Sequence, residues 1–291
     1  MNHTTDRRTM LRTATGLALG TLGLGFTTSH VGAADNKDFA GFPFGVQSYT
    51  FRKFNLEQCL KRIQDVGLHY VEFYRGHVPT TSTPEQIKSV VKLCKDYEVS
   101  PIAFGVESFT KNTDANKKIF EFAAALGVKH LSADPTPDSF DSLDKLVEEY
   151  KISIAIHPHG PSGKGRHRWW SATTILAAVK DHHPLIGTCL DTGHLIRMAQ
   201  LGETLDPAKE IEIMGARNFG LHLKDHDNKK KTDVIYGQAG GVLDVQSVLN
   251  MLKKVQFKGY ISIEYEAKAD EPTTDVKELV KIVKATCAKL N

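Results

Sequence analysis

The stretch Ile186-Gly187-Thr188-Cys189-Leu190-Asp191-Thr192-Gly193-His194 contains the pattern that decides the fold. Its first five residues carry no charge and are largely apolar, which is typical of a short strand that is buried on both faces. Asp191 follows this run directly, and His194 lies three residues further on. The stretch therefore predicts a buried strand that ends at chemically active side chains.

The same pattern recurs about eight times after residue 40, with helix-like stretches between the strand-like runs. The strand-like runs are Phe44–Thr50, Tyr70–Tyr74, Ser100–Val106, Lys129–Ala133, Ile152–Ile156, Ile186–Leu190, Asn218–Leu223 and Tyr260–Tyr265. The helix-like stretches are Asn55–Val66, a stretch that opens with Thr83-Pro84-Glu85-Gln86, Asp114–Leu126, Ser142–Tyr150, Thr173–Asp181, Pro207–Met214, Val245–Val255 and Thr274–Lys289.

This repeated order predicts a parallel sheet covered on both faces by helices. Eight strand–helix units in about 250 residues match a closed (β/α)8 barrel. We therefore predict an α/β protein with one TIM-barrel domain over residues 40–291. A doubly wound open sheet is the alternative, but no glycine-rich dinucleotide-binding turn follows the first strand.

Residues 1–33 have the composition of an export signal. Arg7 and Arg8 precede an apolar, glycine-containing run from Leu17 to Phe26, and small residues follow at 31–34. A basic start, an apolar centre and a small-residue end are typical of a signal peptide, and paired arginines indicate the twin-arginine route. A membrane anchor would need about 20 uninterrupted apolar residues. We expect a periplasmic or otherwise exported protein that has no membrane segment after signal removal.

Charge and cysteine content exclude several classes of function. The formal net charge is +3, of which residues 1–33 supply +2 through three arginines and one aspartate. The remaining chain is close to neutral, which argues against nucleic acid as a partner. The cysteines form no CxxC pair that would indicate a zinc knuckle, and their apolar surroundings favour buried thiols over disulfides. The four are Cys59, Cys94, Cys189 and Cys287.

Polar side chains stand at the ends of most of the predicted strands. In such barrels the active site is built at the C-terminal ends of the strands, so these groups should converge on one rim. Clustered carboxylates would repel each other unless a cation neutralises them. A mixture of carboxylates and imidazoles suits Mn²⁺, Co²⁺, Fe²⁺ or Zn²⁺ better than Ca²⁺. The groups are Glu72, Arg75, Glu107, Asp134, His157, His159, Asp191, His194, His222, Lys224, Asp225, His226, Glu264 and Glu266.

Alternation along the strands selects the candidate metal ligands. Asp191 sits at the tip of its strand, while His222 and Glu264 fall on the lumen side of theirs. Of His157 and His159, which share the same side, we expect one to bind the ion and the other to contact substrate. His194 is a candidate for substrate contact or for supporting a ligand.

Four motifs in the expected order resemble those of the xylose-isomerase-like barrel superfamily, which includes sugar phosphate isomerases and epimerases. They are IAIHPHG at 154–160, LDTGH at 190–194, LHLKD at 221–225 and SIEYE at 262–266, and a glycine-rich segment at 236–244 also fits. The resemblance covers about Phe44 to Thr274. It implies one Mn²⁺-like ion held by Asp191, His222, Glu264 and a strand-five residue. That residue is His157 here, where epimerases have glutamate, and the His-Pro-His version is similar to the inosose dehydratase and keto-sugar branch.

The resemblance implies a sugar isomerase or epimerase that abstracts a proton next to a carbonyl, with a metal-stabilised enediolate. Glu264, His157 or His159 would be the base, and Lys224 would donate a hydrogen bond to a substrate oxygen. Glu107 and Glu72 are candidates for hydroxyl recognition or a second proton transfer, or else they are ion-pair partners of Arg75 or Lys111.

Three other functions compete with isomerisation. The first is elimination or hydration on a keto-sugar or keto-inositol, since histidine replaces one of the two bases that an epimerase uses. The others are a metal-dependent endonuclease, which the charge argues against, and a carbohydrate-binding barrel without activity. Arg75 is a further substrate-binding candidate. Trp169, with Trp170, is either a sugar-stacking residue or a contact between subunits of a homo-oligomer.

Overall fold

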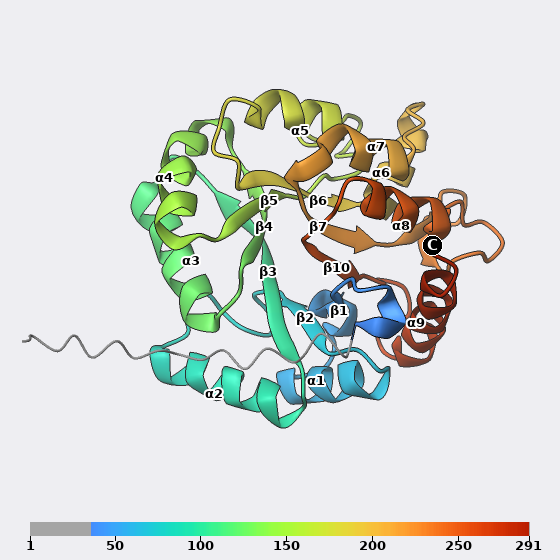
Figure 1. Cartoon of the computed structure of the whole chain (residues 1–291), viewed down its shortest axis with the longest axis horizontal. Coiled ribbons are helices and arrows are strands. Elements are labelled where there is room, and N and C mark those ends of the chain that lie inside the picture. The colour runs from blue at the N-terminus through green and yellow to red at the C-terminus, as the bar shows by residue number, and fades with distance from the viewer. Residues whose placement is uncertain (1–35, 291) are drawn as a thin grey trace, which may run out of the picture. The chain divides into compact units, whose positions relative to one another are not determined.

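The computed structural model describes residues 36–290, so the predicted export signal at 1–33 lies outside the described part of the chain. Within that part, strands and helices alternate along the sequence (Figure 1). The strands are β1 (Phe44–Gln47), β2 (Tyr70–Phe73), β3 (Ser100–Phe109), β4 (His130–Pro135), β5 (Ser153–Ile156), β6 (Ile186–Asp191), β7 (Asn218–Leu223), β8 (Asp225–Asp227), β9 (Thr232–Val234) and β10 (Tyr260–Ile263).

Eight of these strands form a closed parallel barrel in the order β1-β10-β7-β6-β5-β4-β3-β2. Every neighbouring pair is parallel, and β1 closes the ring by pairing with both β2 and β10. The prediction of a single (β/α)8 TIM barrel is therefore confirmed, and the open-sheet alternative is wrong. The remaining strands, β8 and β9, form a separate antiparallel hairpin after β7.

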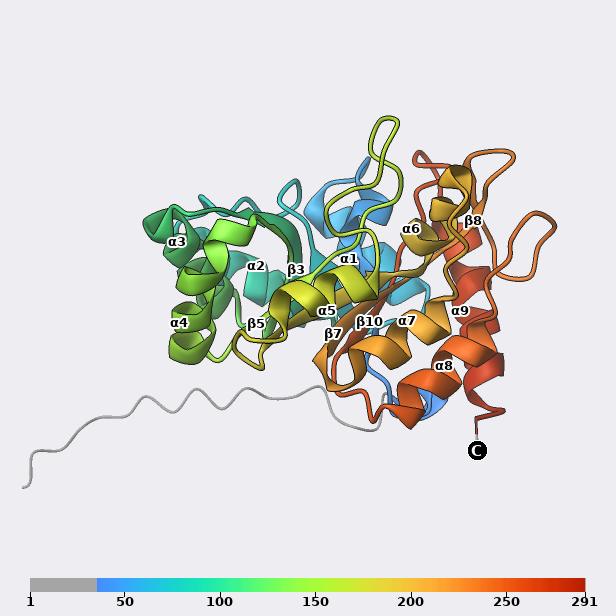
Figure 2. The ribbon, with the colours of Figure 1, turned by 90° about the horizontal axis from the view of Figure 1, so that it is seen from above.

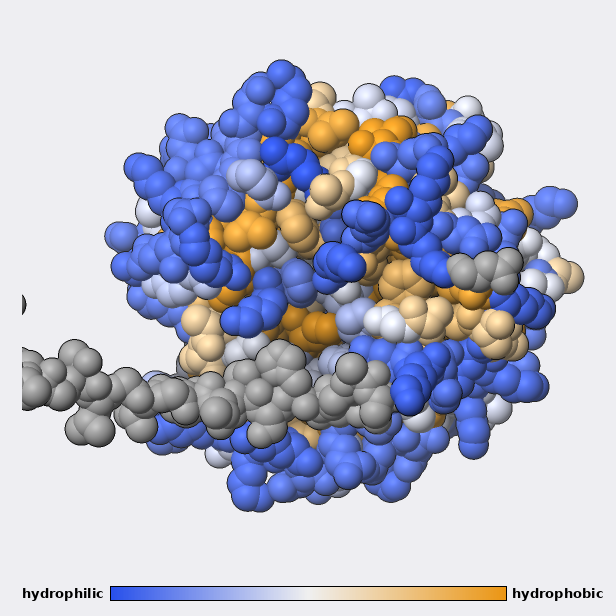
Figure 3. All heavy atoms as spheres, in the orientation of Figure 1, coloured by the Kyte–Doolittle hydropathy of each residue, from blue (hydrophilic) through white to orange (hydrophobic). Residues whose placement is uncertain are grey.

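The helices surround the barrel (Figure 1). Asn55 and Thr83 start α1 and α2 with complete capping boxes, in which Gln58 and Gln86 bond back to the cap residue. Figure 3 shows that the outer rim of one face, where the helices lie, is mainly hydrophilic, as expected for helices that bury only one side. The helices are α1 (Leu56–Asp65), α2 (Pro84–Asp96), α3 (Thr113–Leu126), α4 (Phe140–Tyr150), α5 (Ala172–Val179), α6 (Thr192–Arg197), α7 (Pro207–Met214), α8 (Val245–Lys254) and α9 (Thr273–Cys287).

Several element boundaries differ from the prediction, chiefly near the ends of strands. β1 stops at Gln47 because the Gln47 side chain accepts the backbone N–H of Tyr49 and starts the 3-10 helix η2 (Ser48–Phe51). β3 continues to Phe109, beyond the predicted end. The short helix α6, the 3-10 helix η4 (Met198–Leu201) and the β8–β9 hairpin were not predicted, because each is too short to show a period in the sequence.

The lumen of the barrel is filled by side chains, with a small lower layer of Ala103, Ala155, Cys189 and Tyr260. Gly220 lies directly against the Tyr260 ring, and an added Cβ would stand 2.6 Å from its Cζ. The lumen is thus packed below the strand ends, so a ligand that enters the barrel would bind at its C-terminal mouth.

All four cysteines are buried free thiols, as the sequence indicated. Burial raises the pKa of the Cys94 thiol to about 12, so it is protonated and unreactive at neutral pH. No helix between residues 36 and 290 combines the length and the apolar character needed to cross a membrane.

Candidate metal centre

Strand register brings the predicted ligands together at the C-terminal mouth of the barrel. Asp191, the last residue of β6, pairs with His222 of β7, and His222 pairs with Ser262 of β10. Glu264 follows β10 directly, and His157 follows β5. Because parallel strands all end at the same rim, four segments that are distant in sequence meet at one point.

Four buried side chains there offer donor atoms that all lie within 4.8 Å of one another. His157 Nε2 is 3.1 Å from His222 Nδ1 and 3.4 Å from Asp191 Oδ2, while His222 Nδ1 is 3.3 Å from Glu264 Oε2. The set thus consists of two imidazoles and two carboxylates, namely His157, Asp191, His222 and Glu264.

A divalent cation fits this donor set. The buried Asp191 Oδ2 has no hydrogen-bond partner, although the ammonium of Lys224 lies 3.2 Å from it. A cation held between this carboxylate oxygen and the imidazole nitrogens of His157 and His222 would satisfy it. Neutral imidazole and carboxylate together suit Mn²⁺, Fe²⁺, Co²⁺ or Zn²⁺.

Lys224 supplies positive charge to the same cluster. Its Nζ lies 2.6 Å from Glu264 Oε2 and 2.7 Å from Glu266 Oε1. Burial by itself would lower the pKa of Lys224, but the nearby carboxylates outweigh it and hold that pKa well above its ordinary value. The same contacts lower the pKa values of Asp191 and Glu264 against the opposing effect of burial, so both carboxylates are ionised.

Glu72 lies beneath His222 and is fully buried. Its Oε2 accepts hydrogen bonds from His222 Nε2 at 2.8 Å and from Ser262 Oγ at 2.9 Å. The Nε2–H bond leaves Nδ1 of His222 free to ligate, which is how a carboxylate behind a histidine orients it towards a metal. Glu72 thus contacts His222 and offers no exposed surface to a substrate, although the sequence made it a candidate for substrate contact. Sequence reasoning could not predict this contact, because the two residues lie on separate strands.

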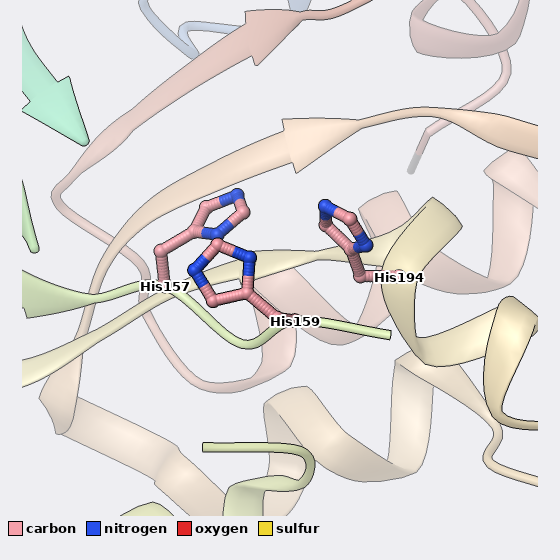
Figure 4. A group of neighbouring side chains, drawn as sticks. All are labelled: His157, His159 and His194. Atoms are coloured by element: carbon pink, nitrogen blue, oxygen red, sulfur yellow. The ribbon is translucent and has the colours of Figure 1, made fainter. Parts of the chain in front are cut away.

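His159 and His194 are not members of the four-donor set but lie next to His157, with His157 and His159 coming from the segment after β5 and His194 from α6 (Figure 4). The ring centroids of His159 and His194 lie 4.9 and 5.3 Å from that of His157. His194 Nδ1 accepts the backbone N–H of Gly160 at 3.0 Å, which leaves its Nε2 available. These three histidines also have donors within 4.8 Å, as do Asp134, His159 and His167, but neither group contains two carboxylates.

A cavity of about 240 Å³, lined mainly by residues with polar groups, opens at this end of the barrel, and we call it the mouth cavity. Glu264 is the one member of the four-donor set that lines it, and His194 lies beside it. The cavity is lined by Gln47, Tyr49, Tyr74, Arg75, Gly105, Val106, His194, Glu264 and Glu266.

Arg75 and Glu107 form an ion pair at the edge of the mouth cavity. Arg75 Nε donates to Glu107 Oε1 at 3.0 Å, and a second nitrogen contacts Oε2. Of the alternatives that the sequence left open, the structure shows the ion pair with Arg75. Arg75 lines the cavity, whereas Glu107 is buried behind it. Glu107 therefore orients Arg75 and has no surface for direct contact with a sugar.

Trp169 does not lie where a sugar could stack on it, so that prediction is wrong. The side chain is 3% exposed, its Nε1–H donates to the Pro135 carbonyl at 2.9 Å, and its ring packs on Phe140. The neighbouring Trp170 is covered by the guanidinium of Arg166 at 4.6 Å. The loop after β5 thus uses Trp169 as an anchor. In Figure 2 this loop, α6 and β8 extend from the same side of the barrel.

The burial of His159 should make the metal-free protein sensitive to acid. Burial, with nearby histidines, lowers the pKa of His159 to about 3, while an unfolded histidine binds its proton near 6.5. The folded state therefore loses stability as pH falls from 6.5 towards 3, by about 2 kcal/mol at pH 5. In urea titrations with chelator at pH 7 and pH 5, we expect His159→Gln to show a clearly smaller loss than the parent. The partly exposed His183, changed to glutamine, is the control, and an unchanged loss in His159→Gln would contradict the assignment.

Comparison with known proteins places this geometry among relatives. Residues 60–286 match a family model described as a xylose isomerase-like TIM barrel. A search of curated proteins gave no significant match. Among solved structures, an uncharacterized protein from Parabacteroides distasonis has 26% sequence identity and a TM-score of 0.65, over 84% of this chain and 98% of that one.

Two further structures are similar in fold only. The 3-keto-D-glucoside 4-epimerase of E. coli has 14% identity and a TM-score of 0.63, over 84% of this chain and 99% of the epimerase. A xylose isomerase-like TIM barrel protein from Mycobacterium smegmatis, solved in complex with magnesium, has 11% identity and a TM-score of 0.64, over 84% and 96% of the two chains.

Proposed function

The chain belongs to the xylose isomerase-like TIM barrel family, and on that premise we propose that it is a divalent-metal-dependent sugar isomerase or epimerase. The substrate is a small carbohydrate with a carbonyl group, and the reaction begins with removal of a proton from the neighbouring carbon. The relative that acts on a 3-keto-D-glucoside supports a keto-sugar as substrate.

One observation carries the proposal. The buried donor set of His157, Asp191, His222 and Glu264 meets the mouth cavity at Glu264. A sugar in that cavity would have its reacting carbon next to a carboxylate and its oxygens next to the donor set. A purely structural cluster would have no reason to open onto a cavity.

Each side chain of the site has a distinct task in this reaction. The ion, Mn²⁺ by our expectation, would be held by the four donors and would supply the charge that polarises the carbonyl oxygen. Glu264 accepts the proton, and Lys224 donates a charge-assisted hydrogen bond to a substrate oxygen. Arg75 and His194 orient the sugar from the wall of the cavity. His159 is the second candidate for moving a proton.

Proton exchange tests the reaction type. Keto-sugars would be incubated in D₂O with the full chain and Mn²⁺, and deuterium at the carbon next to the carbonyl would be followed by NMR. Deuterium incorporation with only isomeric products supports isomerisation or epimerisation. No incorporation with any keto-sugar would count against proton abstraction altogether.

Elimination from a keto-sugar or keto-inositol is the second candidate function. It is favoured because the two other buried glutamates near the site are bonded to neighbouring side chains. Two-base epimerisation needs a second free base facing Glu264. Glu72 is bonded to His222 and Glu107 to Arg75, so neither of these carboxylates is free, and an epimerase would have to use His159 as the second base. Lys224, an ammonium next to Glu264, is placed to protonate a departing oxygen. A dehydrated or cleaved product in the same D₂O experiment would select this candidate.

The proposed role of Glu72 predicts a loss of metal affinity. In Glu72→Gln the carboxylate behind His222 is replaced by an amide, which orients the imidazole less strongly. We expect affinity for Mn²⁺ to fall about 10–100-fold, measured by calorimetric titration of chelator-treated protein. Glu85→Gln on the outside of α2 is the matched control. Unchanged affinity in Glu72→Gln would show that Glu72 does not position a ligand.

We further propose that the protein is exported through the signal at 1–33 and acts on unphosphorylated sugar. The near-neutral mature chain argues against nucleic acid as a partner. Cell fractionation checks the export by comparing where the parent protein and a variant with both Arg7→Lys and Arg8→Lys are found. Retention of that variant in the cytoplasm is the expected outcome.

A further inference from the structure

A second cavity, of about 270 Å³, lies beside the mouth cavity and has no task in the proposed reaction. We call it the side cavity. Its walls include Arg197 at the end of α6, His226 and Asp233 of the β8–β9 hairpin, Lys231 in the turn of that hairpin, and Glu266.

The two cavities adjoin each other through shared and bonded residues. Glu266 lines both of them. Arg197 of the side cavity lies 3.2 Å, Nη1 to Nδ1, from His194 of the mouth cavity. A molecule that reaches from one cavity to the other would therefore pass Glu266 and the His194–Arg197 contact. Each cavity alone is smaller than the roughly 300 Å³ at which ligand pockets begin, while the two together fall within the usual range.

Hydrogen bonds hold the wall of the side cavity in place. His226 Nδ1 donates to Asp233 Oδ1 at 3.0 Å, and Asp233 Oδ2 accepts the backbone N–H of Glu266 at 2.8 Å. At the base of the hairpin, Asp225 Oδ1 accepts the backbone N–H groups of Val242 and Leu243. The cavity is thus built by fixed elements, and both oxygens of Asp233 are already engaged.

The groups left over on this wall are a mixture of donors and acceptors. His226 uses Nδ1 in its bond to Asp233, and its other ring nitrogen, the buried Nε2, has no partner in the part of the chain described. Arg197 and Lys231 provide donors, and neither has a carboxylate within ion-pair distance among residues 36–290. Glu266 adds a carboxylate. A phosphate or carboxylate group would meet the two cations, but the carboxylate of Glu266 on the same wall would repel it.

Hydroxyl groups match this wall, because each can donate to His226 Nε2 or Glu266 and accept from Arg197 or Lys231. We propose that the side cavity binds the second sugar unit of a glycoside whose reacting keto-sugar unit lies in the mouth cavity. This inference rests on the proposed function for the identity of the reacting unit, and it narrows the substrate class from single sugars to two-unit glycosides.

Binding of unreactive sugars to the full chain tests the subsite without any turnover. The probes are cellobiose, maltose, sucrose and trehalose as two-unit sugars, methyl β-D-glucopyranoside as a one-unit sugar, and glucuronic acid as an anionic one, titrated by NMR with Mn²⁺ present. At least one two-unit probe should bind about tenfold or more tightly than the methyl glucoside, as one or two extra hydrogen bonds allow. Tighter binding of glucuronic acid than of every two-unit probe would overturn the proposal in favour of an anion site.

Variants locate the effect in the side cavity. Lys231→Ala at the exposed turn and His226→Leu on the buried wall should both abolish the preference for the two-unit probe while keeping affinity for the methyl glucoside. Lys229→Ala, on the same turn but not on the cavity wall, should keep the preference. If no two-unit probe is preferred, or if the preference survives Lys231→Ala and His226→Leu, the proposal is wrong.

Failure of this inference differs from failure of the proposed function. If no deuterium exchange occurs, the proposed reaction is wrong, but tighter binding of a two-unit sugar would still support the subsite. Exchange with a single-unit keto-sugar, combined with equal binding of one-unit and two-unit probes, would remove only the subsite.

Discussion

Replacing Glu264 with glutamine is expected to lower kcat by about 10²–10⁴-fold, because the amide cannot accept the proton that the carboxylate removes. The barrel should stay folded, since Lys224 keeps Glu266 and Asp191 as partners. Glu264 also belongs to the donor set, so its replacement should weaken metal affinity as well. The rate is therefore to be measured at saturating Mn²⁺, on the keto-sugar that shows exchange in D₂O.

Glu278→Gln on the outside of α9 is the control for this substitution, since Glu278 contacts only the neighbouring Lys281 in that region. It changes the charge of the chain by the same amount and should keep the parent kcat. Full activity of Glu264→Gln at saturating Mn²⁺ would remove Glu264 as the base. The proton would then be removed by another group, and His159 would be the next candidate to replace.

Removal of the ion is expected to have the second-largest effect. Chelation should reduce kcat/KM by at least about 100-fold, because the charge next to the carbonyl oxygen is lost. It should also lower Tm: binding at 100 times Kd stabilises a folded protein by about 2.7 kcal/mol, which corresponds to about 5–10 °C for a barrel of this size. Thermal scans with and without Mn²⁺ measure the change.

The donor set gives this experiment its own control. In His222→Ala the ion loses a ligand from the centre of the set, so Mn²⁺ should raise Tm much less than in the parent. An increase in Tm of equal size in both proteins would place the ion elsewhere. The group of Asp134, His159 and His167 would then be the first alternative to examine.

His159 and His222 are expected to affect the pH dependence of folding stability in opposite directions. Burial opposes the charged form of His222, but Cys189, Glu72 and Glu264 together raise the pKa of His222 well above its ordinary value. In the metal-free protein, protonated His222 therefore stabilises the fold below its unfolded pKa near 6.5, and this contribution is lost as pH rises through the higher folded value. The free energy of unfolding of the chelated protein should accordingly decrease at low pH through His159 and at high pH through His222.

Much of the architecture could be predicted because it follows from local rules. The run Ile186–Leu190 carries no charge, and its seven counterparts are short and rich in apolar or β-branched residues, which indicates strands of a sheet that is covered on both faces. Asn55 and Thr83 mark helix starts by capping chemistry that involves residues three positions away. The position of Asp191 at a strand tip follows from the same local pattern.

The arrangement of the site could not be predicted, because it depends on distances between strands that local sequence patterns do not reveal. Glu72 and His222 are 150 positions apart, and their hydrogen bond arises only after the barrel closes. The same closure brings His157 into the donor set and leaves His159 outside it. Trp169 was misplaced because a tryptophan in a polar loop can turn outward or inward, and only the Pro135 carbonyl and Phe140 decide which.

The eight strand–helix units, and the rim on which their polar ends meet, follow from the sequence alone, because burial and capping act over a few residues. The folded barrel was needed to show which polar ends share one point, which carboxylates are bonded to other side chains, and that a hairpin after β7 builds a second cavity. These features depend on strand register and side-chain direction across the closed barrel, where a shift of one residue would turn His222 away from the lumen.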